Sequence, residues 1–113
     1  MNIIKVHEAE NLKNPHGINV KKIYDTEHAQ TMHLTLAPGE ALHKHLTPVD
    51  VFFYVLEGTG IVEIGGEEQE VGADTLIDSP ANISHCWYNR SAAPVRILVV
   101  KVPRPTTAPK FVD

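Results

Sequence analysis

The histidines are the residues of this sequence with the clearest potential for chemistry. Seven occur in 113 residues, and two of them, His43 and His45, flank a single lysine. On a β-strand this spacing projects both imidazoles to the same face, because side chains alternate with a period of two. A third imidazole from another strand, for which His85 is the natural candidate, would complete a facial metal site. Such a site suits a divalent transition metal such as iron, manganese, nickel or zinc and leaves coordination positions open for water, oxygen or a bidentate oxyanion.

The elements that must position these histidines are predicted to be β-strands. Residues 32–36 alternate apolar and polar side chains, and residues 94–102 are apolar on both faces, as in a strand buried on both sides. Residues 51–57 form a β-branched and aromatic run, and residues 60–71 indicate a hairpin with a Gly-Gly turn. Further short strands are expected near Ile18–Tyr24, Thr75–Asp78 and Ile83–Asn89. Many short strands separated by turn residues predict a sandwich or a closed barrel.

The run that ends at Asn89 resembles the second motif of the cupin family, G-x5-P-x-G-x2-H-x3-N. Pro80, His85 and Asn89 match this pattern in their spacing. Asn82 stands where the family has glycine, and the gap between Gly72 and the proline is two residues longer than in the family pattern. The resemblance implies an all-β fold, a single-domain jelly-roll barrel or double-stranded β-helix of the RmlC-like type.

The run from Gly39 to Gly58 resembles the first cupin motif, G-x5-H-x-H-x3,4-E-x6-G. When both glycines are aligned, His45 takes the position of the first family histidine. Thr47 then replaces the second histidine and Val51 replaces the glutamate. In this alignment only two imidazoles remain of four family ligands, and two imidazoles alone make a weak, labile metal site.

A second alignment slides the first motif, so that His43 and His45 are the paired histidines and Asp50 replaces the glutamate. It shortens the gap after the first glycine and needs a bulge near Thr47-Pro48 to absorb the extra residue. The pleat of residues 51–57 places Asp50 on the face opposite to Val51, so Asp50 stays an outside candidate. We expect the metal ligands to be His43, His45 and His85.

The remaining candidates would shape a ligand pocket beside these histidines. Phe53 and Trp87 are expected to wall an apolar pocket, and Asn89 shares the strand face of His85 and Trp87. His33 is expected to face either the barrel interior or water. The last three histidines lie in polar surroundings and are expected at the surface: His7, His16 and His28.

Length and composition narrow the class of protein. A chain of 113 residues, 42% hydrophobic and 21% charged, suits a single domain over residues 1–113, with motifs at about 39–58 and 72–89 and an extended tail at 103–113. A net charge of −4 and a pI near 5.9 argue against a nucleic-acid partner, and no apolar run is long enough for a membrane helix. Cys86 is the only cysteine and no secretory signal is visible, which favours a reducing, cytoplasmic setting. The strand buried on both faces and the resemblance to cupins predict a homodimer.

Three functions compete on these observations. The first is a small cupin that binds a divalent metal through histidines together with a small-molecule ligand, with a dioxygenase, an isomerase or a related enzyme among the activities that the resemblance implies. The second is a metal-free module that binds a sugar or an aromatic molecule through Phe53, Trp87 and Asn89. The third is a structural or regulatory barrel without a ligand. The fold alone does not choose among them.

Overall fold

Short strands are the main regular elements of the computed structural model, which describes residues 1–112; Asp113, the last residue of the expected tail, lies outside the described residues. The strands are β1 (Asn19–Asp25), β2 (Gln30–Leu36), β3 (Ala41–Leu46), β4 (Val51–Glu57), β5 (Gly60–Ile64), β6 (Glu67–Val71), β7 (Leu76–Ser79), β8 (His85–Tyr88), β9 (Val95–Lys101) and β10 (Lys110–Phe111). One 3-10 turn, η1 (Val6–Glu8), precedes them. No helix within residues 1–112 has the length and hydrophobicity that crossing a membrane requires.

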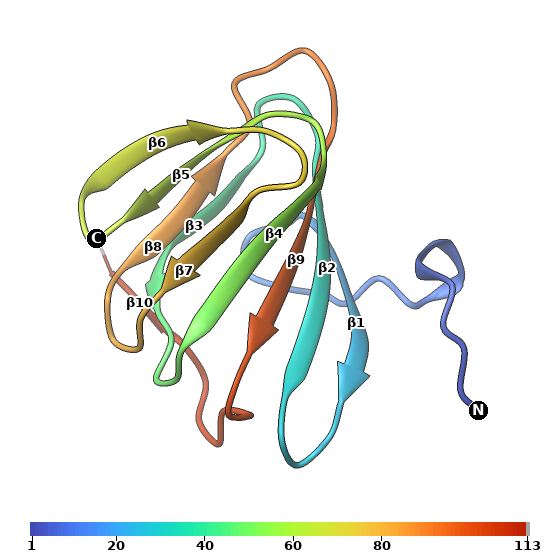
Figure 1. Ribbon diagram of the computed structural model, residues 1–113. Coiled ribbons are helices and arrows are strands. Elements are labelled where there is room, and N and C mark those ends of the chain that lie inside the picture. Colours follow the sequence, from blue (N-terminus) through green and yellow to red (C-terminus); the bar gives the residue numbers. More distant parts are fainter. Residues whose placement is uncertain (113) are drawn as a thin grey trace.

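The strands form two five-stranded antiparallel sheets that face each other (Figure 1). One sheet has the order β1-β2-β9-β4-β7, and the other has the order β10-β3-β8-β5-β6. This arrangement confirms the predicted all-β jelly roll.

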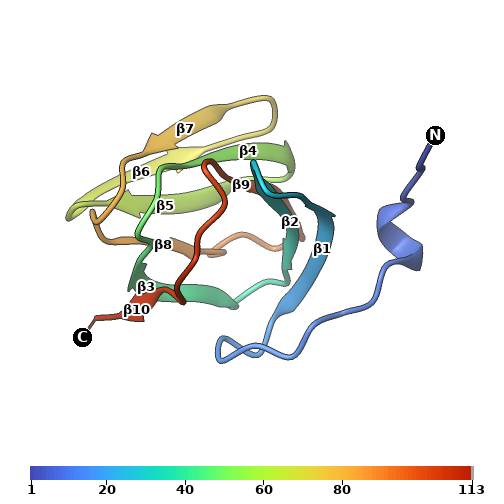
Figure 2. The ribbon, with the colours of Figure 1, turned by 90° about the horizontal axis from the view of Figure 1, so that it is seen from below.

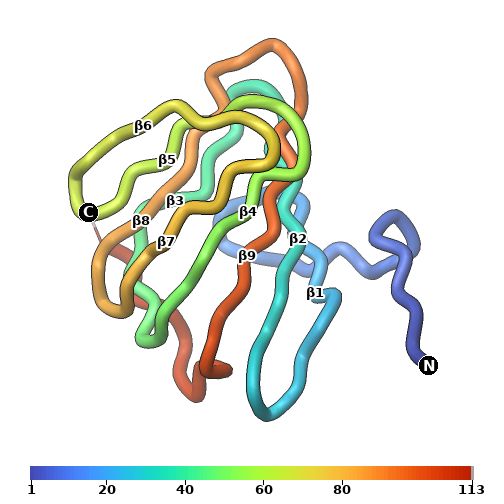
Figure 3. Tube along the Cα trace, in the orientation of Figure 1, coloured from blue at the N-terminus to red at the C-terminus, as the bar shows by residue number. Residues whose placement is uncertain are grey.

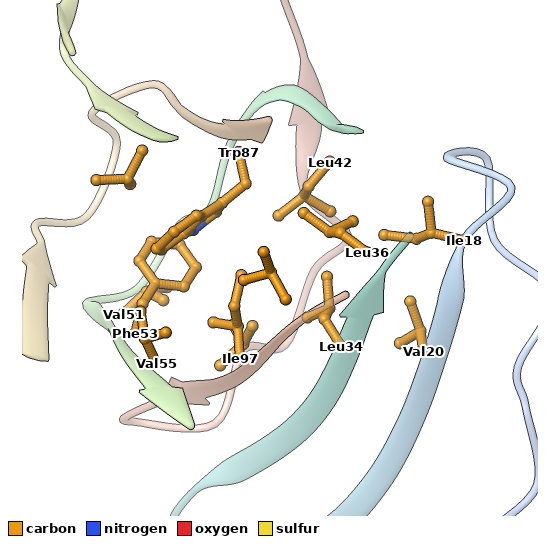
Figure 4. Close-up of a cluster of buried hydrophobic side chains, with 13 residues drawn as sticks. Ile18, Val20, Leu34, Leu36, Leu42, Val51, Phe53, Val55, Trp87 and Ile97 are labelled. Atoms are coloured by element: carbon orange, nitrogen blue, oxygen red, sulfur yellow. The ribbon is translucent and has the colours of Figure 1, made fainter. Parts of the chain in front are cut away.

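The core lies between the two sheets and follows the period of two along each strand (Figure 4). On β4, Val51, Phe53 and Val55 are buried, while the residues between them face outward. Trp87 of β8 meets Phe53 edge to face, with ring centroids 5.5 Å apart. Each fully buried side chain of this size contributes roughly 1.5–3 kcal/mol relative to an exposed one. The facing apolar sides of the two sheets therefore hold the barrel together.

A β-bulge in β3 interrupts the period of two at the paired histidines. Leu42 pairs with Trp87 and His45 pairs with His85, so three steps along β3 match two steps along β8. The extra residue lies within the segment that contains His43. As a result, the two histidines of this strand do not share the geometry that their spacing predicted.

The C-terminal segment closes one end of the barrel. After β9 the chain runs across this end and adds β10 to the edge of β3 (Figure 2). Lys110 pairs with Leu46, and Phe111 pairs with His45. The C-terminal tail, which the sequence predicts to be extended, therefore lies against the barrel of its own chain as an added edge strand.

The first part of the chain, residues 1–10, extends away from the barrel on the side of β1 (Figure 3). Ile3 and Ile4 are 74% and 55% exposed. Lys21 Nζ of β1 donates a hydrogen bond to the Val6 carbonyl at 3.0 Å, and this contact holds this part of the chain to the sheet.

Candidate functional site

The structure brings two of the expected histidines into direct contact. His45 of β3 and His85 of β8 lie opposite each other in neighbouring strands, and their Nε2 atoms are 3.0 Å apart. The rings meet edge to face with centroids 4.5 Å apart. Both side chains are buried, at 6% and 2% exposed.

Hydrogen bonds fix where the protons of this pair reside. His45 Nδ1 lies 2.6 Å from the His43 carbonyl, which only accepts, so Nδ1 carries the hydrogen. In the neutral ring of His45, Nε2 is then an acceptor, and His85 Nε2 must donate across the 3.0 Å contact. His85 Nδ1 is left to accept from the Ser79 hydroxyl at 2.7 Å. The result is a one-directional chain of hydrogen bonds that runs from Ser79 through both imidazoles to a backbone carbonyl.

Burial keeps both imidazoles neutral. Desolvation, followed by the nearby His45 and Lys101, lowers the pKa of His85 to about 3. The pKa of His45 is lowered chiefly by burial as well, although its hydrogen bond to the His43 carbonyl acts in the opposite direction. Both rings therefore act as neutral hydrogen-bond donors and acceptors, and burial disfavours their uptake of a proton.

A cavity of about 360 Å³ opens next to this pair. Its walls are largely apolar and come from both sheets, from the segment before β1 and from the C-terminal segment. They are Asn14, Pro15, His16, Val20, Met32, Leu34, Leu42, His45, Phe53, His85, Val99, Lys101, Ala108, Pro109 and Phe111. The polar groups of this lining are few, as is usual for a small-molecule site.

Two cavity residues, His16 and Lys101, were not expected from the sequence. His16 was expected at the surface but is half-buried, and its Nδ1 accepts a hydrogen bond from the His43 backbone N–H at 2.8 Å. Desolvation, then His45 and His43, lower its pKa to about 4. The pattern of β9 carried a signal for Lys101, because it lies two residues beyond Val99 on the inward face. Nothing local in the sequence indicated His16, which reaches the site from outside the strands.

The other candidate ligands take three different positions. The His43 side chain is exposed and its ring stacks on His16, with centroids 5.3 Å apart, so it does not join the pair. Asp50 is exposed as well and accepts a hydrogen bond from the Ala81 backbone N–H. Thr47, in contrast, is buried, and its hydroxyl lies 3.4 Å from His85 Nε2. These positions agree with the alignment anchored on the two glycines.

The three residues that were expected to form a ligand pocket lie in different surroundings. Phe53 lines the cavity and meets His85 edge to face, with centroids 5.2 Å apart. Trp87 is fully buried behind Phe53 and is not part of the lining. Asn89 is buried too, where its amide donates to the carbonyls of Leu36 and Ala93 and so ties two loops together. Of the three, only Phe53 is placed to contact a ligand in this cavity.

His33 lies outside the cavity, on the outer face of its sheet. It is 2% exposed, and its Nε2 accepts a hydrogen bond from Arg96 Nε at 3.2 Å. Arg96 reaches it from the neighbouring strand β9. The two residues therefore belong to the back of the sheet.

The residues at the pair offer little to a metal held by the protein alone. No group of three histidine, cysteine, aspartate or glutamate side chains within residues 1–112 gathers at one point. Val51 is an apolar core residue where the family pattern has a carboxylate, and Lys101 adds a positive charge to the same cavity. A metal ion with three protein ligands does not fit this donor set.

Comparisons with known proteins identify the family. The model of the cupin domain matches residues 32–101. The tetracenomycin polyketide synthase protein TcmJ of Streptomyces glaucescens is 33% identical over 67 residues, which is 58% of this chain and 45% of TcmJ. The chain thus spans less than half the length of that relative.

Solved structures share the fold over nearly the whole chain. The protein TT1209 from Thermus thermophilus is 30% identical, with a TM-score of 0.80 over 93% of this chain and 100% of its own. The polyketide cyclase RemF from Streptomyces resistomycificus is 19% identical, with a TM-score of 0.85 over 100% of this chain and 86% of its own. Together with the family match over residues 32–101, these likenesses show that this chain belongs to the cupin family.

Proposed function

We propose that this protein binds a small, largely apolar molecule inside its barrel, and that this molecule lies in contact with the rings of His45 and His85. The observation that carries the proposal is the cavity of about 360 Å³ with a buried, neutral imidazole pair in its wall. An apolar chamber with a few converging polar groups is the usual form of a small-molecule site. Phe53 supplies a flat apolar surface directly beside His85.

The flat ring of Phe53 beside His85 favours an aromatic ligand. The relative TcmJ is named as a tetracenomycin polyketide synthase protein. A flat ring system would lie against Phe53 and in contact with the imidazoles. Because both rings are neutral, they present no charge to the ligand, and the apolar walls and the edges of the imidazoles suit a flat molecule.

Calorimetric titration with naphthalene and anthraquinone derivatives that carry hydroxyl, carboxamide or carboxylate groups tests the proposal. Val99→Phe adds bulk to the cavity wall and should weaken binding at least about ten-fold. Val100→Phe is the matched control, because Val100 is the next residue of β9 and faces the opposite side of the sheet. Binding that is equally strong in both variants, or no binding across the panel, would contradict the proposal.

A labile metal site at the pair is the second candidate function. Its support is the 3.0 Å separation of the two Nε2 atoms, since two nitrogens bound to one ion at a right angle, each about 2.1 Å from it, lie about 3.0 Å apart. His45 Nδ1 donates to a backbone carbonyl, as is usual for imidazole ligands of metals, and with a metal on Nε2 the His85 Nδ1–H would donate to the Ser79 hydroxyl. Elemental analysis of protein purified without a His-tag would detect it. Stoichiometric metal that disappears in His45→Ala/His85→Ala supports this function, and metal at background in the unmutated protein rules it out.

We further propose a homodimer formed through the outer face of the sheet that contains β4 and β9. Phe52, Tyr54, Leu98 and Val100 alternate with the core residues of these strands and present apolar surface on the outside. Tyr54 and Leu98 are direct neighbours across the two strands, as are Phe52 and Val100. A second copy would cover this surface.

The single cysteine supports a reducing location. Cys86 has no second cysteine with which to form a disulfide within the chain, and it is fully buried. We therefore propose the cytoplasm as its setting. Fractionation of cells that express the native gene would check this.

A further inference from the structure

We propose that the barrel cavity selects an anionic ligand and that Lys101 is the residue that selects it. This inference rests on the proposed function, because it concerns the ligand of the same cavity. It adds a charge requirement that neither the cupin family match nor the imidazole pair supplies.

The position of Lys101 directs its side chain inward. It is the last residue of β9, on the same face as the buried Val95, Ile97 and Val99. Its backbone pairs with Gln30 on one side and with Val51 on the other, so β9 is held between two strands at this point. Its side chain lines the cavity together with His45 and His85.

The charge of Lys101 has no counterpart in the cavity. None of the lining residues is an aspartate or a glutamate. No carboxylate within residues 1–112 lies at ion-pair distance from its Nζ. Two other lysines show the usual alternative, since Lys44 reaches Glu63 at 2.9 Å and Lys22 reaches Asp25 at 3.5 Å. Among the described residues, Lys101 is therefore a partly buried cation without a protein anion.

This cation changes the electrostatics of the imidazole pair. It lowers the pKa of both His45 and His85, although desolvation has the larger effect on each ring. Lys22 is the other charged group that acts on Lys101, and it is positive as well. All the formal charge that faces the cavity is thus of one sign, which opposes a metal cation and favours an anion.

An apolar body with a single negative charge matches this cavity. Removing a cation from water without a partner costs free energy, and a bound carboxylate, phenolate or enolate would recover part of that cost through a charge-assisted hydrogen bond. One lysine balances one negative charge, whereas the remaining polar side chains of the lining are uncharged: the amide of Asn14 and the imidazoles of His16, His45 and His85. The ligand class is therefore a small aromatic or aliphatic monoanion.

The test compares two probes of the same shape, 2-naphthoate and the neutral 2-naphthamide, by isothermal titration calorimetry. The unmutated protein should bind the carboxylate at least about ten-fold more tightly than the amide, which corresponds to about 1.4 kcal/mol. Lys101→Met keeps the length of the side chain and should remove this preference while binding of the amide changes less than about two-fold. Lys101→Arg should retain the preference. Lys13→Met is the control, because it makes the same charge change at an exposed position outside the cavity.

The outcomes separate this inference from the function on which it rests. If the cavity binds both probes equally and Val99→Phe abolishes that binding, the proposed function stands and the role of Lys101 is refuted. If Lys101→Met and Lys13→Met weaken carboxylate binding equally, the preference is a property of net charge and the inference fails. If neither probe binds, both proposals fail for this ligand class. Should Lys101→Met not fold, Lys101→Arg and the ratio of the two probes in the unmutated protein still decide the question.

Discussion

The imidazole pair consists of two titratable groups that the fold keeps uncharged. His45 and His85 each have one nitrogen bound to a fixed partner, a carbonyl and a hydroxyl, and the remaining nitrogens face each other. Adding a proton to either ring would place a charge in a desolvated site near Lys101. The pair therefore stays neutral at ordinary pH, and its role is that of hydrogen-bonding imidazoles rather than of a base.

The lowered pKa values predict how stability depends on pH. The pKa is about 3 for His85 and about 4 for His16 in the folded protein, below the ordinary value of 6.5. Between these values the unfolded chain binds more protons than the folded one, so the free energy of unfolding decreases as the pH falls below 6.5. Each histidine contributes at most about 1.4 kcal/mol per pH unit. Urea unfolding from pH 7.5 to 4.5, an interval of about three units, would measure this slope.

Variants of single histidines show which residues cause this dependence of the free energy of unfolding on pH. His85→Gln should reduce the slope by the contribution of one histidine, because residue 85 then no longer titrates. His28→Gln is the control, since His28 is exposed and lies outside the cavity. An unchanged slope in His85→Gln would show that the pair does not govern acid stability.

At the scale of elements, irregular points in the strands decide what the cavity contains. The bulge in β3 turns His45 inward and leaves His43 outside. A second register shift occurs in the pairing of β4 with β9, between Val55 and Glu57. Gly58 follows directly, with φ +84° and close to the backbone at Pro94. This close approach fixes the end of β4, the strand that carries Phe53 into the cavity.

Substituting Gly58 tests how tightly this corner is built. A Cβ atom at Gly58 would lie 2.3 Å from the Pro94 carbonyl oxygen, so the backbone would have to shift. We expect Gly58→Ala to lower the free energy of unfolding by at least about 3 kcal/mol. Gly39→Ala is the control, because Gly39 has a similar φ of +87° but open space around the added atom. It should cost only about 1–2 kcal/mol. Similar losses for both variants in urea unfolding would show that the contact with Pro94 has no special weight.

At the scale of the whole molecule, the two faces of one sheet have different roles. The inner face of the sheet built on β4 and β9 forms the core and part of the cavity, while its outer face presents apolar side chains on the same strands. The C-terminal segment, which crosses one end of the barrel (Figure 2), lines the cavity. A dimer through the outer face would therefore leave Ala108, Pro109 and Phe111, which border the cavity, on a different side of the molecule.

A charge placed on the outer face tests the dimer. Leu98 lies at the centre of this face, between Tyr54 on β4 and His33 on β2. Leu98→Lys should convert a dimer into a species of 12.5 kDa at micromolar concentration, because a buried lysine without a partner opposes association. Light scattering after size-exclusion chromatography would measure the mass. Ile83→Lys, at a 41% exposed position elsewhere, should leave the dimer intact. An unmutated protein that runs only as the monomer would refute the interface.

The fold and the family could be predicted from the order of the residues alone. Alternation along residues 32–36 and 51–57 defined strands because burial on one face requires a period of two. The spacing of Pro80, His85 and Asn89 pointed to the cupin family, which the match over residues 32–101 confirms. These features depend on local pattern, which is written directly in the order of residues.

Which side chains share the cavity could not be predicted in this way, because it depends on contacts between distant segments. The bulge in β3 depends on its pairing with β8, and one extra residue there reverses the face of a neighbouring histidine. His16 and Phe111 reach the site from segments before β1 and after β9, so their contact with His45 is a matter of chain path. Lys101 follows the period of β9, but its lack of a carboxylate partner appears only when the surrounding strands are in place. Local periodicity determines which way a residue faces within a regular strand, whereas contacts between distant segments are set by packing.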